Sequence, residues 1–231
     1  PLTILQGELE QAVQHAPSGS EQQQTLGRLL EEVQRLKAIT RKLLLLSQVD
    51  SGRLRSHLEP VNLSEMLEAE ADDLDILGAR QTLRRRIEEG LWVVADPDLL
   101  RQVVQNLANN ALKYNVPGGI VALDLRKDGQ SAVLRVGNSG PGIPPDDRGR
   151  VFERFYRADK ARNRRVDGVG LGLSLAREIA RAHGGDLVLE ESRDGWTAFA
   201  LKLPLANPRE EQSAISIQPS AQDRSPDPAS G

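Results

Sequence analysis

Two asparagines and a lysine on one predicted helix have the chemistry needed to hold a phosphorylated ligand. Asn106, Asn110 and Lys113 are spaced at i, i+4 and i+7 in a stretch predicted to be helical over 97–115, so they share one helix face. Asparagine is a poor helix former, and two on one face suggest a use. An amide oxygen is a hard, neutral ligand for Mg²⁺, and lysine supplies a positive charge for phosphate. The alternative is a solvated helix face, and this segment alone does not decide between the two.

Two glycine-rich segments downstream add to this pattern. The segment 136–144 follows a predicted strand, and its glycines let the backbone approach a flat ligand closely. Asn138 within it is able to accept a hydrogen bond from an exocyclic amine and to donate one to a ring nitrogen. The second segment, 168–173, opens a helix predicted over 171–182, and glycine-rich backbone at a helix N-terminus favours anions. Either segment by itself also fits an ordinary loop.

The stretch between the two glycine segments is opposite in charge to the whole chain. Residues 146–167 contain eight basic and five acidic residues, a net charge of +3, whereas all 231 residues together carry −3. Such a run is usually a solvated surface. A basic loop between two glycine turns is also what a lid over a triphosphate requires.

Composition excludes several classes of protein. The chain is 39% hydrophobic and 27% charged, which is typical of a soluble globular protein. It has no cysteine, which excludes disulfides, thiolate metal sites and cysteine nucleophiles. No apolar run approaches the roughly 18 residues of a membrane span, and no signal peptide is expected. The balanced charge predicts no nucleic-acid partner and no membrane contact for this chain.

The elements that must position these residues divide the chain into four parts. Leucines at three- and four-residue spacing predict an antiparallel helical hairpin over 1–50, with Ser20 as the N-cap of its second helix. Residues 51–60 are expected to be a linker, and 206–231, rich in Pro, Ser and Gln, a disordered tail.

The remaining part, 61–205, predicts an α+β domain in which a mixed sheet carries its helices on one face. Residues 137–170 are expected to be mostly loop. Asp96 is the expected N-cap of the helix that carries the asparagines, because Pro97 suits a first helical turn. The expected helices are 64–78, 97–115 and 171–182, and the expected strands are 82–88, 91–95, 120–126, 132–136, 187–190 and 197–203.

Taken in order, four segments resemble the N, G1, F and G2 boxes of the ATP-binding domain of sensor histidine kinases. The hairpin over 1–50 resembles the dimerisation and phosphotransfer module of the same family, so the resemblance covers about residues 1–205. It implies an α/β-sandwich of the type shared by histidine kinases, chaperones and topoisomerase ATPases. The four segments are Asn106-Leu-Ala-Asn-Asn110-Ala-Leu-Lys113-Tyr114, Asn138-Ser-Gly140-Pro-Gly142-Ile143, Val151-Phe152-Glu-Arg-Phe155-Tyr156-Arg157 and Gly168-Val-Gly170-Leu-Gly172-Leu173.

The resemblance implies ATP and Mg²⁺ as the ligands and a role for each box. Asn110, with Asn106 in support, would hold Mg²⁺ against the phosphates. Lys113 would contact phosphate, and Tyr114 would pack on adenine. Asn138 stands where the family usually has Asp, and its carbonyl would accept a hydrogen bond from the adenine amine.

The basic loop and the glycine turns receive roles in the same way. Phe152, Phe155 and Tyr156 would anchor a lid over the nucleotide, and Arg157 would reach phosphate. The second glycine turn would hold the phosphates at a helix end. Further contacts to ATP are expected from Gly140, Gly142, Ile143, Gly168, Gly170, Leu171, Gly172, Leu173 and Thr197.

The sequence departs from the family at its first residues. The family's phosphoacceptor lies in a His-Glu-x-x-Thr-Pro run, whereas this sequence begins Pro1-Leu2-Thr3. His15, His57 and His183 are expected to be structural or solvated, so no catalytic residue is assigned. We therefore expect a piece of a longer kinase that binds ATP and does not phosphorylate itself.

The implied parent transfers the γ-phosphoryl group of ATP to a histidine of its dimerisation helix. It works as a homodimer through the hairpin and has a response-regulator receiver domain as its partner. The resemblance also implies a cytoplasmic location for this part of an inner-membrane sensor.

Three other classes of function remain as alternatives. Related chaperone and topoisomerase ATPases use a Glu four residues before the Mg²⁺ asparagine, where this chain has Asn106, an amide that cannot act as a general base. A non-catalytic dimerisation scaffold with a vestigial nucleotide site is disfavoured by Asn110, Lys113 and the glycines. Nucleic-acid binding through residues 84–86 is disfavoured by the neighbouring acidic pair at 88–89 and the lack of a nearby aromatic platform.

Overall fold

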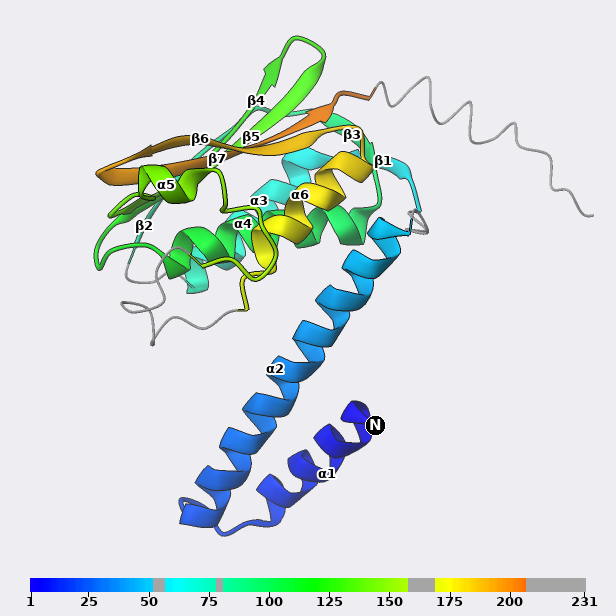
Figure 1. Ribbon diagram of the computed structural model, residues 1–231, viewed down its shortest axis with the longest axis vertical. Helices are drawn as coiled ribbons and strands as arrows, with labels where there is room; N and C mark the ends of the chain where they lie inside the picture. Colours follow the sequence, from blue (N-terminus) through cyan, green and yellow to red (C-terminus); the bar gives the residue numbers. More distant parts are fainter. Residues whose placement is uncertain (52–56, 78–80, 158–168, 207–231) are drawn as a thin grey trace, which may run out of the picture.

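The computed structural model describes residues 1–51, 57–77, 81–157 and 169–206 as a helical hairpin followed by an α/β-sandwich (Figure 1). Gly168 and all of the expected tail except its first residue lie outside the described residues.

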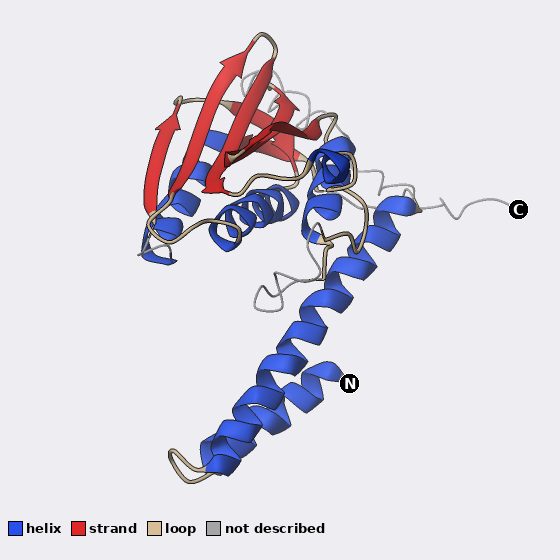
Figure 2. Cartoon of the chain, turned by 60° about the vertical axis from the view of Figure 1, so that its left-hand side comes forward, coloured by secondary structure: helices blue, strands red, loops and turns tan. Residues whose placement is uncertain are grey.

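The hairpin forms as its leucine spacing predicts. It consists of α1 (Leu2–His15) and α2 (Glu21–Asp50), which run side by side in Figures 1 and 2. Ser20 caps α2, because its hydroxyl oxygen accepts a hydrogen bond of 3.1 Å from the backbone N–H of Gln23. No residue of α1 is buried, and in α2 only Val33 and Leu46 are. The apolar stripe of the hairpin is therefore largely uncovered in the described chain.

The C-terminal half of α2 packs against the sandwich, while its N-terminal half projects away from it (Figure 2). Leu46 is buried in the core of the sandwich, and Ile39 and Leu45 pack against that core. The C-terminal half of α2 is therefore part of the hydrophobic core of the sandwich.

The sandwich confirms the predicted α+β class. Its main sheet has the strand order β2-β4-β5-β7-β6, with β2 parallel to β4 and every other neighbouring pair antiparallel. Helices α3, α4 and α6 cover one face of this sheet (Figures 1 and 2). The bounds are α3 Leu63–Leu77, β2 Thr82–Ile87, α4 Pro97–Lys113, β4 Ile120–Asp128, β5 Ser131–Gly140, α6 Gly172–Ala182, β6 Asp186–Arg193 and β7 Gly195–Pro204.

Two small elements were not predicted as such. A separate two-stranded sheet pairs β1 (Glu59–Asn62) with β3 (Trp92–Ala95), so the first strand begins inside the stretch expected to be a linker. A single-turn helix, α5 (Pro145–Arg148), lies in the stretch expected to be loop. Short elements such as these carry too few periodic residues to be recognised from sequence.

Strand β5 is longer than predicted and reaches the first glycine segment. Asn138 pairs with Val121 on one side and with Thr197 on the other, so both neighbouring strands continue the ladder beyond Val136. Gly137 allows this, because a Cβ there would lie 2.4 Å from Cζ2 of Trp196. The first half of the segment 136–144 is therefore strand and not loop.

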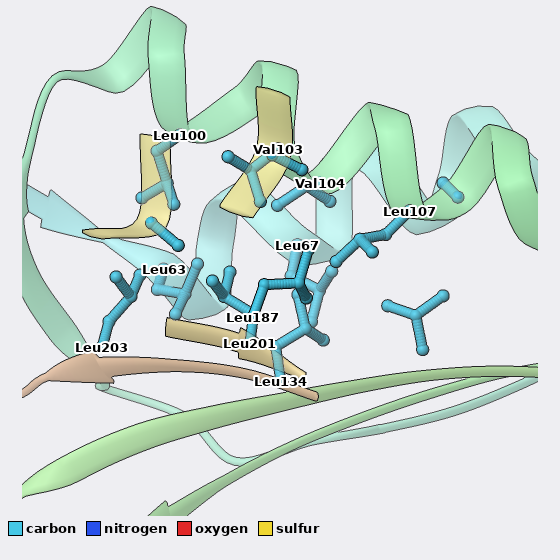
Figure 3. Packing of buried hydrophobic residues seen from close by; sticks show 14 of the residues in the cluster. Leu63, Leu67, Leu100, Val103, Val104, Leu107, Leu134, Leu187, Leu201 and Leu203 are labelled. Carbon is cyan, nitrogen blue, oxygen red and sulfur yellow. The ribbon is translucent and has the colours of Figure 1, made fainter. Parts of the chain in front are cut away.

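The core lies between α4 and the sheet (Figure 3). Alternate residues of β5 and β7 point toward the helices, and one face of α4 points back at them. Full burial of each leucine or valine stabilises the fold by about 1.5–3 kcal/mol. Residues of this cluster with no more than 2% of their surface exposed include Leu67, Leu100, Val103, Val104, Leu107, Leu134, Leu187, Leu201 and Leu203.

His183 joins the end of α6 to the start of α4. Its Nε2 accepts a hydrogen bond of 3.0 Å from the backbone N–H of Asp96, and its Nδ1 lies 2.7 Å from the carbonyl oxygen of Ile179. The first bond requires a free lone pair on Nε2, so Nδ1 carries the proton and donates to Ile179. Asp96 in turn caps α4 by accepting from the backbone N–H groups of Asp98 and Leu99, as predicted.

The turn after α6 generates a first test of the fold. A Cβ at Gly185 would lie 2.0 Å from the carbonyl oxygen of Lys202, so Gly185→Ala must push β6 away from β7. We expect the free energy of unfolding, measured by urea denaturation, to fall by about 1–3 kcal/mol or more. Gly149→Ala is the matched control, because nothing lies within 4 Å of a Cβ there and its φ is −69°. Equal losses in the two variants would contradict the packing described here.

Candidate functional site

Two adjoining cavities lie at the C-terminal half of α4. Their volumes are about 630 and 670 Å³, within the range of small-molecule sites. The helix-side cavity lies between α4, the first turn of α6 and α2, and the strand-side cavity lies between the end of α4, β5 and β7. The residues common to both are Asn110, Lys113, Tyr114, Val151 and Leu173.

The polar face of α4 lines the helix-side cavity. Asn106, Asn110 and Lys113 all border it, so the structure brings together the three residues that helical spacing predicted. Nδ2 of Asn106 is buried and has no hydrogen-bond partner, and within the described chain it is the one buried side-chain nitrogen or oxygen in this condition. Such a donor costs about 1–3 kcal/mol when left unpaired. An oxygen of a ligand in this cavity would remove that cost.

The second glycine segment lies against Asn106 and lines the helix-side cavity together with it. Gly170 has a φ of +75°, and a Cβ there would lie 2.6 Å from the carbonyl oxygen of Tyr156. A Cβ at Gly172 would lie 3.5 Å from Oδ1 of Asn106, which shows how closely the two helices approach. The N-cap residue of α6 is Leu171, whose side chain makes no capping hydrogen bond, and no other cap is recorded among the described residues. The first N–H groups of α6 are therefore available to an anion at this end of the cavity, which Leu171 and Leu173 also line.

Asn138 presents a single acceptor to the strand-side cavity. Its side chain is buried, and Nδ2 donates to the carbonyl oxygens of Tyr114 at 3.2 Å and of Ser139 at 2.9 Å. Both amide protons are thereby used, so the expected donation to a ring nitrogen of a ligand is wrong. The expected acceptance of a hydrogen bond is still possible, through Oδ1. Thr197, the cross-strand partner of Asn138, is also buried and lines the same cavity.

The first glycine segment forms the wall of the strand-side cavity through close backbone contacts. A Cβ at Gly140 would lie 2.7 Å from the carbonyl oxygen of Tyr114. Gly142 has a φ of +77°, and a Cβ there would lie 2.4 Å from the carbonyl oxygen of Arg193. No other residue type fits either position without moving the backbone. Ile143 lines the cavity next to this turn.

The aromatic residues of the third segment separate into different environments. Phe152 packs edge-on against Phe199 of β7, with 6.0 Å between ring centroids, and so holds this segment to the core. The hydroxyl of Tyr156 donates to a carboxylate oxygen of Asp147. Phe155 is 58% exposed and has a φ of +64°, so its ring is not anchored as expected. Its backbone N–H donates instead to the carbonyl oxygen of Gly170, which joins the segment to the second glycine turn.

Tyr114 and Arg157 meet at the strand-side cavity. Burial raises the pKa of the Tyr114 phenol above its usual value, and the positive charge of Arg157 acts in the opposite direction. Both side chains line this cavity. Gly168, expected to contact phosphate, lies outside the described residues.

Several cavity residues were missed by the sequence analysis. Arg148, Arg193 and Asp194 line the strand-side cavity. Charged residues of α2 form one wall of the helix-side cavity. From the leucine pattern, these residues are predicted only to lie on the polar face of the helix. No sequence signal indicates that this face meets a cavity, because the contact depends on how α2 packs against the sandwich. The residues of α2 concerned are Arg28, Glu31, Glu32, Arg35 and Lys42.

The basic run in β2 and the lengths of the helices concern nucleic acid and membrane as partners. Arg85, in the basic run of β2, forms ion pairs with Asp72 at 2.6 Å and Glu68 at 3.3 Å. In the described ranges, no helix combines the length and the apolar character that crossing a bilayer requires.

Comparison with known proteins gives consistent results. The family described as "Histidine kinase-, DNA gyrase B-, and HSP90-like ATPase" matches residues 95–207. Sensor histidine kinase WalK of Bacillus subtilis is 33% identical over 184 residues, covering 78% of this chain and 30% of WalK. The solved mycobacterial sensor histidine kinase MprB is 31% identical, with a TM-score of 0.58, covering 64% of this chain and 98% of that one.

A third comparison includes the hairpin. The solved structure of full-length ShkA has a TM-score of 0.72 and 24% identity, covering 89% of this chain and 46% of ShkA, which supports the arrangement of hairpin and sandwich as a fold. The chain spans less than half the length of the curated relatives it matches. The identity to MprB over nearly all of that structure, together with the match at 95–207, shows that the chain belongs to the sensor histidine kinase family and carries its ATP-binding domain.

Proposed function

We propose that this chain binds ATP with Mg²⁺ across the two cavities and serves as the kinase part of a two-component sensor. The adenine would occupy the strand-side cavity and the triphosphate the helix-side cavity. The observation that carries the proposal is that the two cavities share Asn110 and Lys113 as lining residues, with an acceptor-only amide in one and an unpaired donor in the other.

The strand-side cavity has the features of a purine site. Oδ1 of Asn138 would accept a hydrogen bond from the exocyclic amine of adenine, and an oxo group at that position would find no donor there. Thr197 and Tyr114 lie beside it. The backbone at Gly140 and Gly142 has no side chain to obstruct a flat base.

The helix-side cavity has neutral and positive groups suited to phosphates. Asn110 would ligate Mg²⁺ through its amide oxygen, with Asn106 in support through its own amide oxygen or by donating from Nδ2 to a phosphate oxygen. The described residues contain no group of three His, Cys, Asp or Glu that could hold a metal by themselves, so the nucleotide must supply the anionic ligands. When bound, Mg²⁺ neutralises charge on the phosphates. Lys113 would supply a further positive charge.

The residues of the sandwich favour phosphoryl transfer over hydrolysis. The described residues of the sandwich that line the helix-side cavity are amides, glycines, apolar residues, Tyr114 or Lys113, and none of them is a carboxylate that could activate water; the carboxylates of this cavity, Glu31 and Glu32, belong to α2. ATP would then persist until a nucleophile is presented. The chain's contribution is to orient the triphosphate and to balance its charge.

The nucleophile we propose is a histidine other than the three in this chain. His183 has both ring nitrogens in hydrogen bonds and is buried. His15 lies at the end of α1 that points away from the sandwich, with Nδ1 2.7 Å from the carbonyl oxygen of Gln11 (Figure 1). His57 is bound through its backbone N–H to Asp96 at the opposite end of α4 from Asn110. The proposed acceptor is a histidine of the dimerisation helix of the parent kinase.

The proposal extends to partners of the parent. The exposed leucines Leu29, Leu36 and Leu43 of α2 are spaced by seven residues, which is the seam of a helical bundle. We propose that the hairpin forms a homodimer through this seam. A response-regulator receiver domain would take the phosphoryl group from the parent kinase. We propose that this part of the parent lies in the cytoplasm, where ATP is available.

Replacing Asn110 tests the nucleotide site. Asn110→Ala removes the proposed Mg²⁺ ligand, and we expect the affinity for ATP in the presence of Mg²⁺ to fall by about 10- to 100-fold in isothermal titration. Gln102→Ala is the matched control, because Gln102 is an amide on the same helix and lines neither cavity. Unchanged affinity in Asn110→Ala would remove the assignment of this face to Mg²⁺ and phosphate.

The positions of the histidines predict the outcome of incubation with labelled ATP. We expect no acid-labile phosphate on the chain after incubation with Mg²⁺ and γ-labelled ATP, measured on denatured protein at alkaline pH. Label that disappears in His15→Gln or His57→Gln would contradict this. A separate helical hairpin carrying a family phosphoacceptor histidine serves as the positive control.

The leucine seam predicts a dimer. We expect sedimentation velocity at micromolar concentration to show a dimer that Leu36→Glu dissociates, because a buried unpaired carboxylate is costly. Gln34→Glu introduces the same side chain on another exposed position of α2 and should leave the dimer intact. A monomer for the unchanged chain, or a dimer indifferent to Leu36→Glu, would overturn this interface.

A further inference from the structure

Helix α2 supplies one wall of the cavity that the proposed triphosphate would occupy. Lys42 of α2 borders the same cavity as Asn106, Asn110 and Lys113 of α4. The strand-side cavity, which the adenine would occupy, is also lined by Asn110 and Lys113. A nucleotide that spans both cavities therefore extends its phosphates toward α2.

The packing of α2 fixes the position of Lys42. Ile39, three residues before it, packs against the core of the sandwich, and Leu46, four residues after it, is 2% exposed within that core. Residues three and four apart lie on one side of a helix, so Lys42 shares the side that meets the sandwich.

An ion pair holds the end of the same helix. Nη1 of Arg154 donates to Oδ2 of Asp50 at 2.7 Å, and Nη2 donates to Oδ1 at 2.5 Å. Arg154 belongs to the segment that also carries Phe152, which packs on the core. The wall formed by α2 is thus attached to the sandwich at several points around Lys42.

Lys42 is a half-buried cation whose charge no described residue balances through a hydrogen bond or an ion pair. Burial lowers its pKa below the usual value, because water is removed from the charged form. Arg35, on the same wall, differs in having an ion pair of 3.5 Å with Glu32. An anion in the cavity would restore favourable interactions to Lys42.

We propose that Lys42 binds the terminal phosphate of the nucleotide, so that the helical hairpin contributes a phosphate-binding residue to the site of the sandwich. This proposal rests on the proposed function. It has a thermodynamic consequence, because a ligand that contacts both parts stabilises their contact, and the triphosphate therefore favours the docked position of α2. A nucleotide that lacks the terminal phosphate would stabilise the docked position of α2 less.

Nucleotides of different length test the contact in the full chain. In the presence of Mg²⁺, we expect Lys42→Gln to weaken ATP binding by about tenfold and ADP binding by less than about threefold, with adenosine unchanged. Lys42→Arg should keep most of the affinity for ATP. Lys37→Gln is the matched control, because Lys37 also lies on α2 but donates to Gln6 within the hairpin and does not line the cavity.

Thermal unfolding of each variant checks that the chain remains folded. The proposal is overturned if Lys42→Gln binds ATP as the unchanged chain does. It is also overturned if the variant loses affinity equally for ATP, ADP and adenosine, since that would be a structural effect. Failure of the proposed function is distinguishable, because the unchanged chain would then bind no ATP. If Asn110→Ala removes ATP binding and Lys42→Gln leaves it intact, only the role proposed for Lys42 is contradicted.

Discussion

Helix α4 has two faces with opposite roles, and the rest of the structure depends on their being held in register. One face is fully buried against the sheet through Val103, Val104 and Leu107. The other carries Asn106 and Asn110 to the cavities. Because side chains on one rigid helix keep fixed angles to one another, packing of the first face sets the position of the second.

The glycine turns complete the site because they allow backbone to come where side chains cannot. At Gly142 and Gly170, the backbone combines a positive φ with a neighbouring carbonyl oxygen less than 3 Å from any added Cβ. These contacts hold the two turns against Arg193 and Tyr156. At these two turns the cavity wall therefore consists of main chain, with no side chain between it and the cavity.

The hairpin lines the helix-side cavity as well as carrying the exposed leucine seam. Asp50 and Leu46 attach α2 to the sandwich at the side where the helix-side cavity opens. Undocking α2 from the sandwich would break the ion pair between Asp50 and Arg154 and expose Leu46. The position of the hairpin and the shape of the cavity are consequently linked.

Periodicity and capping chemistry were sufficient to predict the hairpin, the α+β class, the cap at Asp96 and the shared face of Asn106, Asn110 and Lys113. These features depend on residues close in sequence, so local rules describe them. The extension of β5 through Asn138 was not predictable in this way. It depends on pairing with Thr197, which is distant along the chain.

Tertiary structure alone decided the remaining features of the site. It showed that Asn138 is an acceptor only, because its amide protons are used by carbonyl groups of Tyr114 and Ser139. It also placed Lys42 beside the cavity and left Phe155 exposed. The sequence by itself determined which residues share a helix face or a turn, whereas only three-dimensional packing determined what each of them faces, since that depends on contacts between segments that no local pattern specifies.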